Sequence, residues 1–145
     1  MGGPETSSQG IEARDVETVR AGYARWNSGD AAALRELFTE DIEYQNASQW
    51  PGQRVYRGVN EVMRFLQDEV AEIIALRPVE VVRTDVFGSE ILIELRAHTH
   101  GRLSGLDLDS PSLFHVARMR DGRVSRVRVY LDGNEARRAA QSGTG

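Results

Sequence analysis

The feature that most constrains this chain is the run from Tyr23 to Tyr44, where signals for a helix, a stop, a second helix and a strand follow one another. The stretch Asn27-Ser28-Gly29 ends the first helix, because glycine adopts the left-handed conformation at a helix terminus without a steric clash. Asp30 is suited to cap the next helix by accepting a hydrogen bond from its first free amides. This order predicts the opening of a small domain that mixes helices and strands.

Hydrophobic spacing predicts three helices in the first half of the chain. The apolar residues between Val16 and Trp26 recur at helical spacing, which predicts a helix from about Ile11 to Trp26. A second helix is predicted at 31–38, and a strand follows at 42–46. An apolar stripe then predicts a long helix that begins after Gly58 and ends before Pro78.

The second half of the chain is predicted to be mostly strands. Gly88-Ser89 separates strands predicted at 79–87 and 90–102, and Asp121-Gly122 separates strands predicted at 111–120 and 123–132. Residues 133–140 predict either a short closing helix or a fraying tail. Three helices before a long antiparallel meander predict an α+β domain, with the helices covering the concave face of a bent sheet.

Composition limits the domain organisation and the class of protein. The length of 145 residues fits one domain at 11–140, with small, polar, disordered tails at 1–10 and 141–145. The formal charge of −4, with basic residues interspersed among acidic ones, does not indicate a nucleic-acid partner. The chain has no cysteine, which excludes disulfides, thiolate metal sites and cysteine nucleophiles. A signal-peptide pattern and a membrane-spanning apolar run are both missing, so we expect a cytoplasmic protein without a membrane partner.

Four motifs spread along the chain can be compared with known families: WNSGD at 26–30, LFTED at 37–41, YRG at 56–58 and RMRDGRV at 118–124. Together they resemble the SnoaL-like proteins of the nuclear-transport-factor-2-like superfamily, which also includes ketosteroid isomerase. The resemblance implies a cone-shaped roll, in which three N-terminal helices pack in a strongly curved antiparallel sheet around an internal pocket. It also implies a homodimer formed through the sheet. Members include isomerases, cyclases, dehydratases, hydrolases and proteins without catalytic activity, so the resemblance selects no reaction.

Strand alternation separates the histidines into two groups. On the strand at 90–102 the apolar residues share one face, and His98 and His100 share the other. Those two rings either contribute to a metal site or belong to an ordinary polar surface. His115 alternates in register with apolar neighbours and is therefore predicted to point inward. A buried imidazole needs a hydrogen-bond partner and titrates near neutral pH, so His115 is either a satisfied core residue or an acid or base.

Other side chains are predicted to share the pocket with His115. Tyr44 and Asn46 face inward on the first strand, so the predicted catalytic set is His115, Tyr44 and Asn46. The predicted ligand contacts are Tyr23, Trp26, Trp50, Tyr56 and Met119. Aromatic residues at helical spacing can equally be core residues. Asp107 and Asp109 either present two carboxylates at the pocket rim or belong to a solvated sheet edge.

The resemblance also implies which functional residues differ from those of the isomerase. The isomerase's general base corresponds to Asn46, its oxyanion-hole carboxylic acid to His115 and its first-helix tyrosine to Gly22. An amide cannot accept a proton at neutral pH, so the steroid mechanism is not expected here. The remaining inward hydrogen-bonding groups suit a small, largely apolar molecule with one or two oxygen atoms.

Three functions therefore stay open from the sequence. The first is an enzyme of the isomerase, cyclase, dehydratase or hydrolase type, with His115 as acid or base. The second is a non-catalytic small-molecule-binding protein, and the third is a dimerisation module with a vestigial pocket. No phosphate-binding glycine-rich loop and no convincing metal-ligand set is found, so neither cofactor nor metal is predicted. The expected dimer surface is the sheet face that carries Leu92, Glu94, Arg96 and His98.

Overall fold

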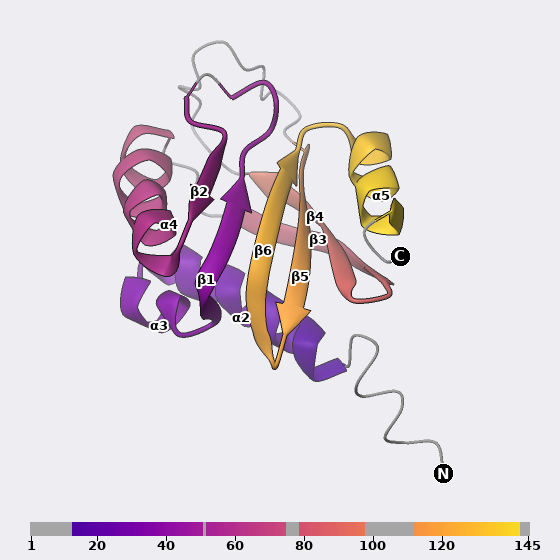
Figure 1. The fold of residues 1–145 in the computed structure, drawn as a ribbon, viewed down its shortest axis with the longest axis horizontal. Helices are drawn as coiled ribbons and strands as arrows, with labels where there is room; N and C mark the ends of the chain where they lie inside the picture. The colour runs from indigo at the N-terminus through magenta and orange to yellow at the C-terminus, as the bar shows by residue number, and fades with distance from the viewer. Residues whose placement is uncertain (1–12, 51, 75–78, 98–111, 143–145) are drawn as a thin grey trace.

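The predicted α+β cone is confirmed by a computed structural model, which describes residues 13–50, 52–74, 79–97 and 112–142. Figure 1 shows a curved, unclosed sheet, with α2 crossing behind it and α5 beside the end of β6. The elements are α2 (Ala13–Ser28), α3 (Ala31–Arg35), β1 (Phe38–Gln45), β2 (Val55–Arg57), α4 (Val59–Phe65), the π-helix η1 (Leu66–Ile74), β3 (Val79–Phe87), β4 (Glu90–Ala97), β5 (Ser112–Arg120), β6 (Arg123–Tyr130) and α5 (Gly133–Ser142).

The sheet has the strand order β2-β1-β6-β5-β4-β3. All neighbouring strands are antiparallel except β1 and β6, which run parallel with Tyr44 opposite Val127. Hairpin-linked strands must be antiparallel, whereas β1 and β6 are joined by most of the chain and can adopt either direction. The register shifts between Phe38 and Glu43, between Val81 and Arg83, and between Arg118 and Met119. Such bulges bend the strands, which supports the curvature of the sheet.

The opening helices form as the sequence predicts. Gly29 has a φ of 80°, and the Asp30 carboxylate accepts a hydrogen bond of 3.1 Å from the Ala33 amide. The second helix ends at Arg35, earlier than predicted, because Phe38 already belongs to β1. No helix in the described part of the chain is both long and apolar enough to cross a membrane.

Two elements between residues 55 and 74 differ from the prediction. Residues 55–57 form the short strand β2, paired with β1, where a loop was expected. The long helix is an α-helix only to Phe65 and continues as the π-helix η1. Its apolar spacing does not distinguish the two helix types, because residues four apart lie on neighbouring parts of one face in both.

Asn27 ties the end of α2 to the edge strand β3. Its Nδ2 donates to the Val79 carbonyl oxygen, and its Oδ1 accepts from the Val79 amide, both at 2.8 Å. The side chain thus supplies the donor and acceptor that a neighbouring strand would offer. This pair of bonds places the helix end against the inner side of the sheet.

The two faces of the sheet bury separate clusters. On the inner face Ile42, Ile91 and Ile93 are completely buried under the helices α2 to α4, in agreement with the predicted alternation. On the outer face α5 packs Ala136 and Ala140 against the sheet, which settles the alternatives for 133–140 in favour of a helix. α5 extends to Ser142, beyond the predicted domain end at 140.

The predicted dimer surface lies on this outer face of the sheet. Leu92 is buried in the cluster beneath α5, so it is covered within the same chain. His98, His100, Asp107 and Asp109 lie outside the described residues, as do the predicted tail at 1–10 and residues 143–145. Homodimerisation through the sheet stays a prediction.

A buried carboxylate organises the outer face. Glu90 is completely buried and accepts bonds from three arginines: Arg118 Nε and Arg126 Nη2 at 2.9 Å, and Arg128 Nη2 at 2.7 Å. These residues lie on β4, β5 and β6, so one carboxylate joins three strands. The cluster was not predicted, although all four side chains fall on outward positions of adjacent strands.

Candidate ligand-binding site

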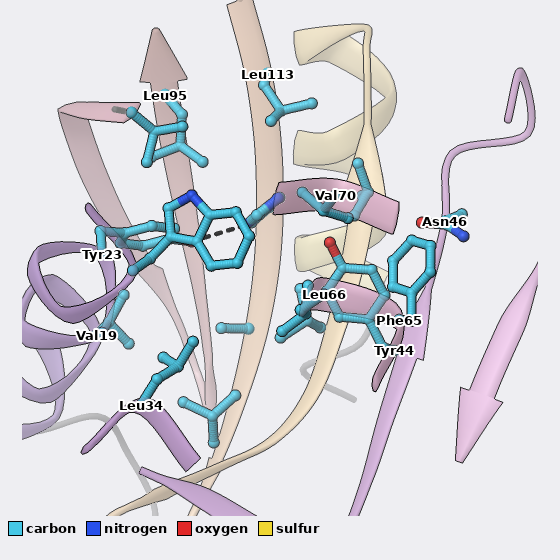
Figure 2. A pocket seen from close by; sticks show the side chains of 18 of the residues that line it. Val19, Tyr23, Leu34, Tyr44, Asn46, Phe65, Leu66, Val70, Leu95 and Leu113 are labelled. Carbon is cyan, nitrogen blue, oxygen red and sulfur yellow. Dashed lines mark hydrogen bonds between the residues drawn. The ribbon is translucent and has the colours of Figure 1, made fainter. Parts of the chain in front are cut away.

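A cavity of about 170 Å³ lies between the helices and the inner face of the sheet (Figure 2). Its walls come from α2, the α3 region, β1 with its following loop, α4 with η1, and the strands β3 to β6. Most lining side chains are aliphatic or aromatic, and among the described residues no Asp, Glu or Arg lines the cavity. The exposed residue Gln49 also lines the cavity, so the cavity reaches the surface at the loop after β1.

Most of the predicted site residues lie around this cavity. The predicted residues that line it are His115, Tyr44, Asn46, Tyr23, Trp26 and Trp50. Tyr56 and Met119 are buried but are not among the lining residues. Tyr56 instead stacks on Phe65, with 4.4 Å between the ring centroids, and so supports the cavity wall from behind.

Tyr23 and His115 form the central polar contact of the cavity. The Tyr23 hydroxyl lies 2.7 Å from Nδ1 of His115. The described residues offer this hydroxyl no other partner. We assign the phenol as the donor to Nδ1, because the reverse tautomer would leave both the phenol O–H and the Nε2 lone pair without a partner. The neutral imidazole then carries its own proton on Nε2, which makes Nε2 a donor. Nε2 has no hydrogen-bond partner in the described part of the protein.

Burial keeps these groups uncharged. Loss of hydration lowers the pKa of His115 from 6.5 to about 4. Part of the ring surface remains exposed, but that surface faces the cavity rather than bulk water. Burial raises the pKa of Tyr44 well above its usual value, and burial together with the nearby Tyr44 hydroxyl raises that of Tyr23. All three side chains are therefore neutral at pH 7.

The Tyr44 hydroxyl is a second open donor. Figure 2 shows it pointing into the cavity from β1. The Tyr44 ring packs against Phe65 at 5.5 Å and stands edge-on to His115 at 6.5 Å, measured between ring centroids. No described residue forms a hydrogen bond with its hydroxyl. The cavity thus presents His115 Nε2–H and Tyr44 O–H as open donors. Trp50, on the same wall, also carries a buried indole N–H that has no partner among the described residues.

Asn46 contributes an acceptor on the same strand face. Its Nδ2 donates to the Gln53 carbonyl oxygen at 2.9 Å, which fixes the orientation of the amide because a carbonyl can only accept. Its backbone amide donates to Arg54 at 2.8 Å, and its backbone carbonyl accepts from Arg54 Nε at 2.9 Å. The Oδ1 atom points toward the cavity in Figure 2. Asn46 therefore anchors the loop after β1 and presents an acceptor to a ligand.

The π-helix shapes one wall. Phe65, Leu66 and Val70 all line the cavity. The i→i+5 hydrogen bonding of a π-helix turns less per residue than an α-helix, so a residue five positions on returns close to the same direction. This brings Val70 onto the same side as Phe65, which an α-helix would rotate apart. Trp50 closes the wall with its ring edge-on to Phe65 at 5.9 Å.

Together these groups favour hydrogen bonding over proton abstraction. The lone pair of the neutral His115 ring is engaged by Tyr23, and a pKa of about 4 makes the ring a weak base at pH 7. The chain contains no lysine, so a side-chain amine cannot form a Schiff base. Among the described residues no cluster of three or more potential metal ligands occurs. The acid or base role of His115 stays a prediction, and the geometry described here suits a hydrogen-bond donor at this position.

Sequence reasoning did not foresee the pairing of Tyr23 with His115. It predicted Tyr23 as a ligand contact and His115 as an inward-facing side chain. Their pairing was not foreseen, because the two residues are 92 positions apart in the sequence. The available signal was the shared helical face of Val19 and Tyr23, which had to point toward the inward side chains of the sheet. It also missed Thr18 and Gln49 as lining residues, since both are polar and resemble surface residues in the sequence.

Comparison with known proteins supports the fold. One similar structure is Bal32a from a soil-derived mobile gene cassette, with a TM-score of 0.70, 24% identity, and coverage of 85% of this chain and 92% of that protein. A putative polyketide cyclase from Sinorhizobium meliloti has a TM-score of 0.60 and 20% identity, with 78% and 93% covered. TerC, crystallised with polyporic acid, has a TM-score of 0.66 and 16% identity, with 90% and 99% covered.

Sequence comparison assigns the family. No curated protein matches this chain. The profile of the SnoaL-like domain matches residues 19–127, which is well over half of the chain and runs from within α2 to within β6. These residues contain most of the cavity wall. The chain therefore belongs to the SnoaL-like domain family.

Proposed function

We propose that this protein binds a small, largely apolar molecule in the cavity and holds an oxygen atom of that molecule with His115 and Tyr44. The observation that carries the proposal is the pair of open donors in a largely apolar enclosure. A buried donor without a partner costs about 1–3 kcal/mol, so an acceptor in the cavity gains both orientation and affinity. The SnoaL-like family, and the names of the related cyclase and of TerC with its bound polyporic acid, are consistent with a small-molecule site.

A second candidate is an enzyme of the isomerase, cyclase or dehydratase type. It is favoured by the same two donors, because preorganised donors stabilise negative charge that develops on a carbonyl oxygen. It is weakened because none of the described lining residues has a pKa near neutrality, and such chemistry also needs a proton acceptor. Binding without turnover is therefore the primary proposal.

Imidazole NMR tests the binding proposal directly. Protein labelled with ¹⁵N-histidine would be screened against a library of uncharged fragments, with the Nε2 resonance of His115 and the melting temperature as readouts. We expect hits that shift the Nε2 signal and raise the melting temperature, with much weaker effects in His115→Phe. Glu135→Gln, on the exposed side of α5, serves as the control and should respond like the wild type. If no uncharged compound perturbs His115, the binding proposal is wrong.

Turnover is checked on the same hits. Product formation that is lost in His115→Gln and kept in Glu135→Gln would support the enzyme candidate. Binding without any product over long incubation would leave binding as the function.

A further inference from the structure

We infer, resting on the proposed function, that the ligand is an uncharged single-ring carbonyl compound and that Gly22 determines its size. Three observations carry the inference: the charge of the cavity wall, the volume of the cavity, and the space beside Gly22 on α2. Each restricts the ligand independently.

The cavity wall excludes a charged ligand. Among the described residues, the titratable side chains that line it are Tyr23, Tyr44 and His115, and burial keeps all three neutral. This described part of the wall contains no arginine or carboxylate that could pair with an ion. Moving an unpaired charge from water into such surroundings is strongly unfavourable. The buried part of the ligand must therefore be uncharged.

The volume limits the ligand to about one ring. The cavity measures about 170 Å³, and an apolar cavity of about 150 Å³ accommodates benzene. One ring with a short substituent fills this space. A fused skeleton of three or four rings exceeds it and would have to extend out through the opening at the loop after β1 or displace the walls.

The polar groups specify a carbonyl oxygen. The Tyr44 hydroxyl points into the cavity, and His115, which lines the same cavity, has its Nε2–H open; a carbonyl oxygen has two lone pairs that can accept from both donors. The Tyr44 and His115 rings stand edge-on at 6.5 Å between centroids. Most of the remaining wall is apolar or aromatic, which suits the ring of the ligand.

Gly22 leaves the space that the ring would occupy. It lies in the interior of α2 and lines the cavity next to Tyr23. A Cβ atom built there would meet only the Leu37 and Leu34 methyl groups, at 3.6 and 3.8 Å, which is ordinary van der Waals contact. The backbone thus does not require glycine, although glycine is the least favourable helix residue other than proline. A larger side chain at this position would project into the cavity.

The experiment compares three probes by isothermal titration calorimetry. Acetophenone is the uncharged one-ring ketone, benzoate carries a carboxylate on the same ring, and androst-4-ene-3,17-dione is a ketone with four fused rings. We expect acetophenone to bind at least tenfold more tightly than either of the other probes. Tyr44→Phe should weaken acetophenone about five- to tenfold, as expected for one lost hydrogen bond.

Two substitutions on α2 test the role of Gly22. Gly22→Leu should abolish acetophenone binding, whereas Ala24→Leu, which adds the same side chain at an exposed position of the same helix, should leave it unchanged. Gly22→Ala should weaken binding several-fold while raising the melting temperature, and it carries the test if Gly22→Leu does not fold.

The outcomes separate this inference from the proposed function. If benzoate or the steroid binds as tightly as acetophenone and Gly22→Leu blocks that binding, the ligand class is wrong but the site stands. The class is also wrong if acetophenone fails to bind while fragments shift the His115 resonance. If neither the probes nor the fragment library perturb His115, the proposed function fails as well.

Discussion

The hydroxyl of Tyr23 on α2 lies 2.7 Å from Nδ1 of His115 on β5, and this contact determines what the cavity can do. It joins the first helix to the inner face of the sheet. With the phenol assigned as the donor to Nδ1, the imidazole proton lies on Nε2. We therefore propose a neutral donor role for a side chain whose type in the sequence indicates a potential acid or base.

Removing the Tyr23 hydroxyl should allow the His115 ring to populate both imidazole tautomers. In Tyr23→Phe the Nδ1 lone pair is left buried without a donor, so we expect a loss of about 1–2 kcal/mol of stability and a mixture of imidazole tautomers. Urea denaturation and the ¹⁵N shifts of His115 measure the two effects. Tyr130→Phe, on the outer face, is the matched control and should change neither quantity. An unchanged His115 spectrum in Tyr23→Phe would contradict the assignment.

The burial of His115 predicts a pH dependence of stability. Its pKa is about 4 in the folded protein against 6.5 as its ordinary value, so between these pH values the unfolded chain binds a proton that the folded chain does not. Stability contributed by this group is therefore complete above about pH 6.5 and falls as the pH drops toward 4, by up to about 3 kcal/mol.

Comparison with His115→Gln isolates this effect from the titration of carboxylates. The difference in unfolding free energy between wild type and His115→Gln should change with pH over the window from 6.5 to 4 and should stay constant above it. A difference that does not depend on pH in that window would show that the imidazole is well hydrated.

Glu90 should be essential for the stability of the outer face. Glu90→Gln leaves Arg118, Arg126 and Arg128 clustered without their common carboxylate. We expect a loss of about 3 kcal/mol, because removing one partner of a buried ion pair leaves uncompensated charge. Glu94→Gln lies on the same strand and the same face and should cost less than about 0.5 kcal/mol. Equal unfolding midpoints for the two variants would contradict this role.

Asn27 should hold the start of β3 in place. Asn27→Asp keeps the acceptor for the Val79 amide but replaces the donor to the Val79 carbonyl by a second acceptor. We expect a loss of about 1–2 kcal/mol and faster hydrogen exchange of the Val79 amide. Asn60→Asp, at an exposed position of α4, is the control. The role is refuted if exchange at Val79 is as slow in Asn27→Asp as in Asn60→Asp.

Gly22→Ala should separate stability from binding. Alanine is more favourable than glycine in a helix interior by about 0.5–1 kcal/mol, and the new methyl group meets its neighbours at ordinary contact distances. The variant should therefore unfold at a higher urea concentration. A loss of stability would mean that α2 packs too tightly there to accept a methyl group.

Local signals in the sequence were sufficient for most of the fold. The stop at Gly29 and the cap at Asp30 form as predicted, because both depend on the conformation of a few adjacent residues. Strand alternation correctly placed Ile91, Ile93 and His115 on the inner face, because side chains alternate along any strand. The same alternation placed Tyr44 and Asn46 on the side of β1 that lines the cavity.

These local signals could not predict contacts between residues that lie far apart in the sequence. The parallel pairing of β1 with β6 depends on how the whole chain closes, and the clustering of Glu90 with arginines of two other strands depends on sheet register. Met119 faces inward as predicted but lies beyond the cavity wall, since alternation gives a direction and not a depth.

The sequence by itself determined the order of the helices and strands, the family, and the choice of inward residues, because each depends on periodicity and on local backbone preferences. Only the tertiary structure decided that Tyr23 meets His115 and that the imidazole is therefore a neutral donor. It also decided the volume beside Gly22. Protonation and cavity size are set by the neighbours that packing brings together, and those neighbours come from segments far apart along the chain.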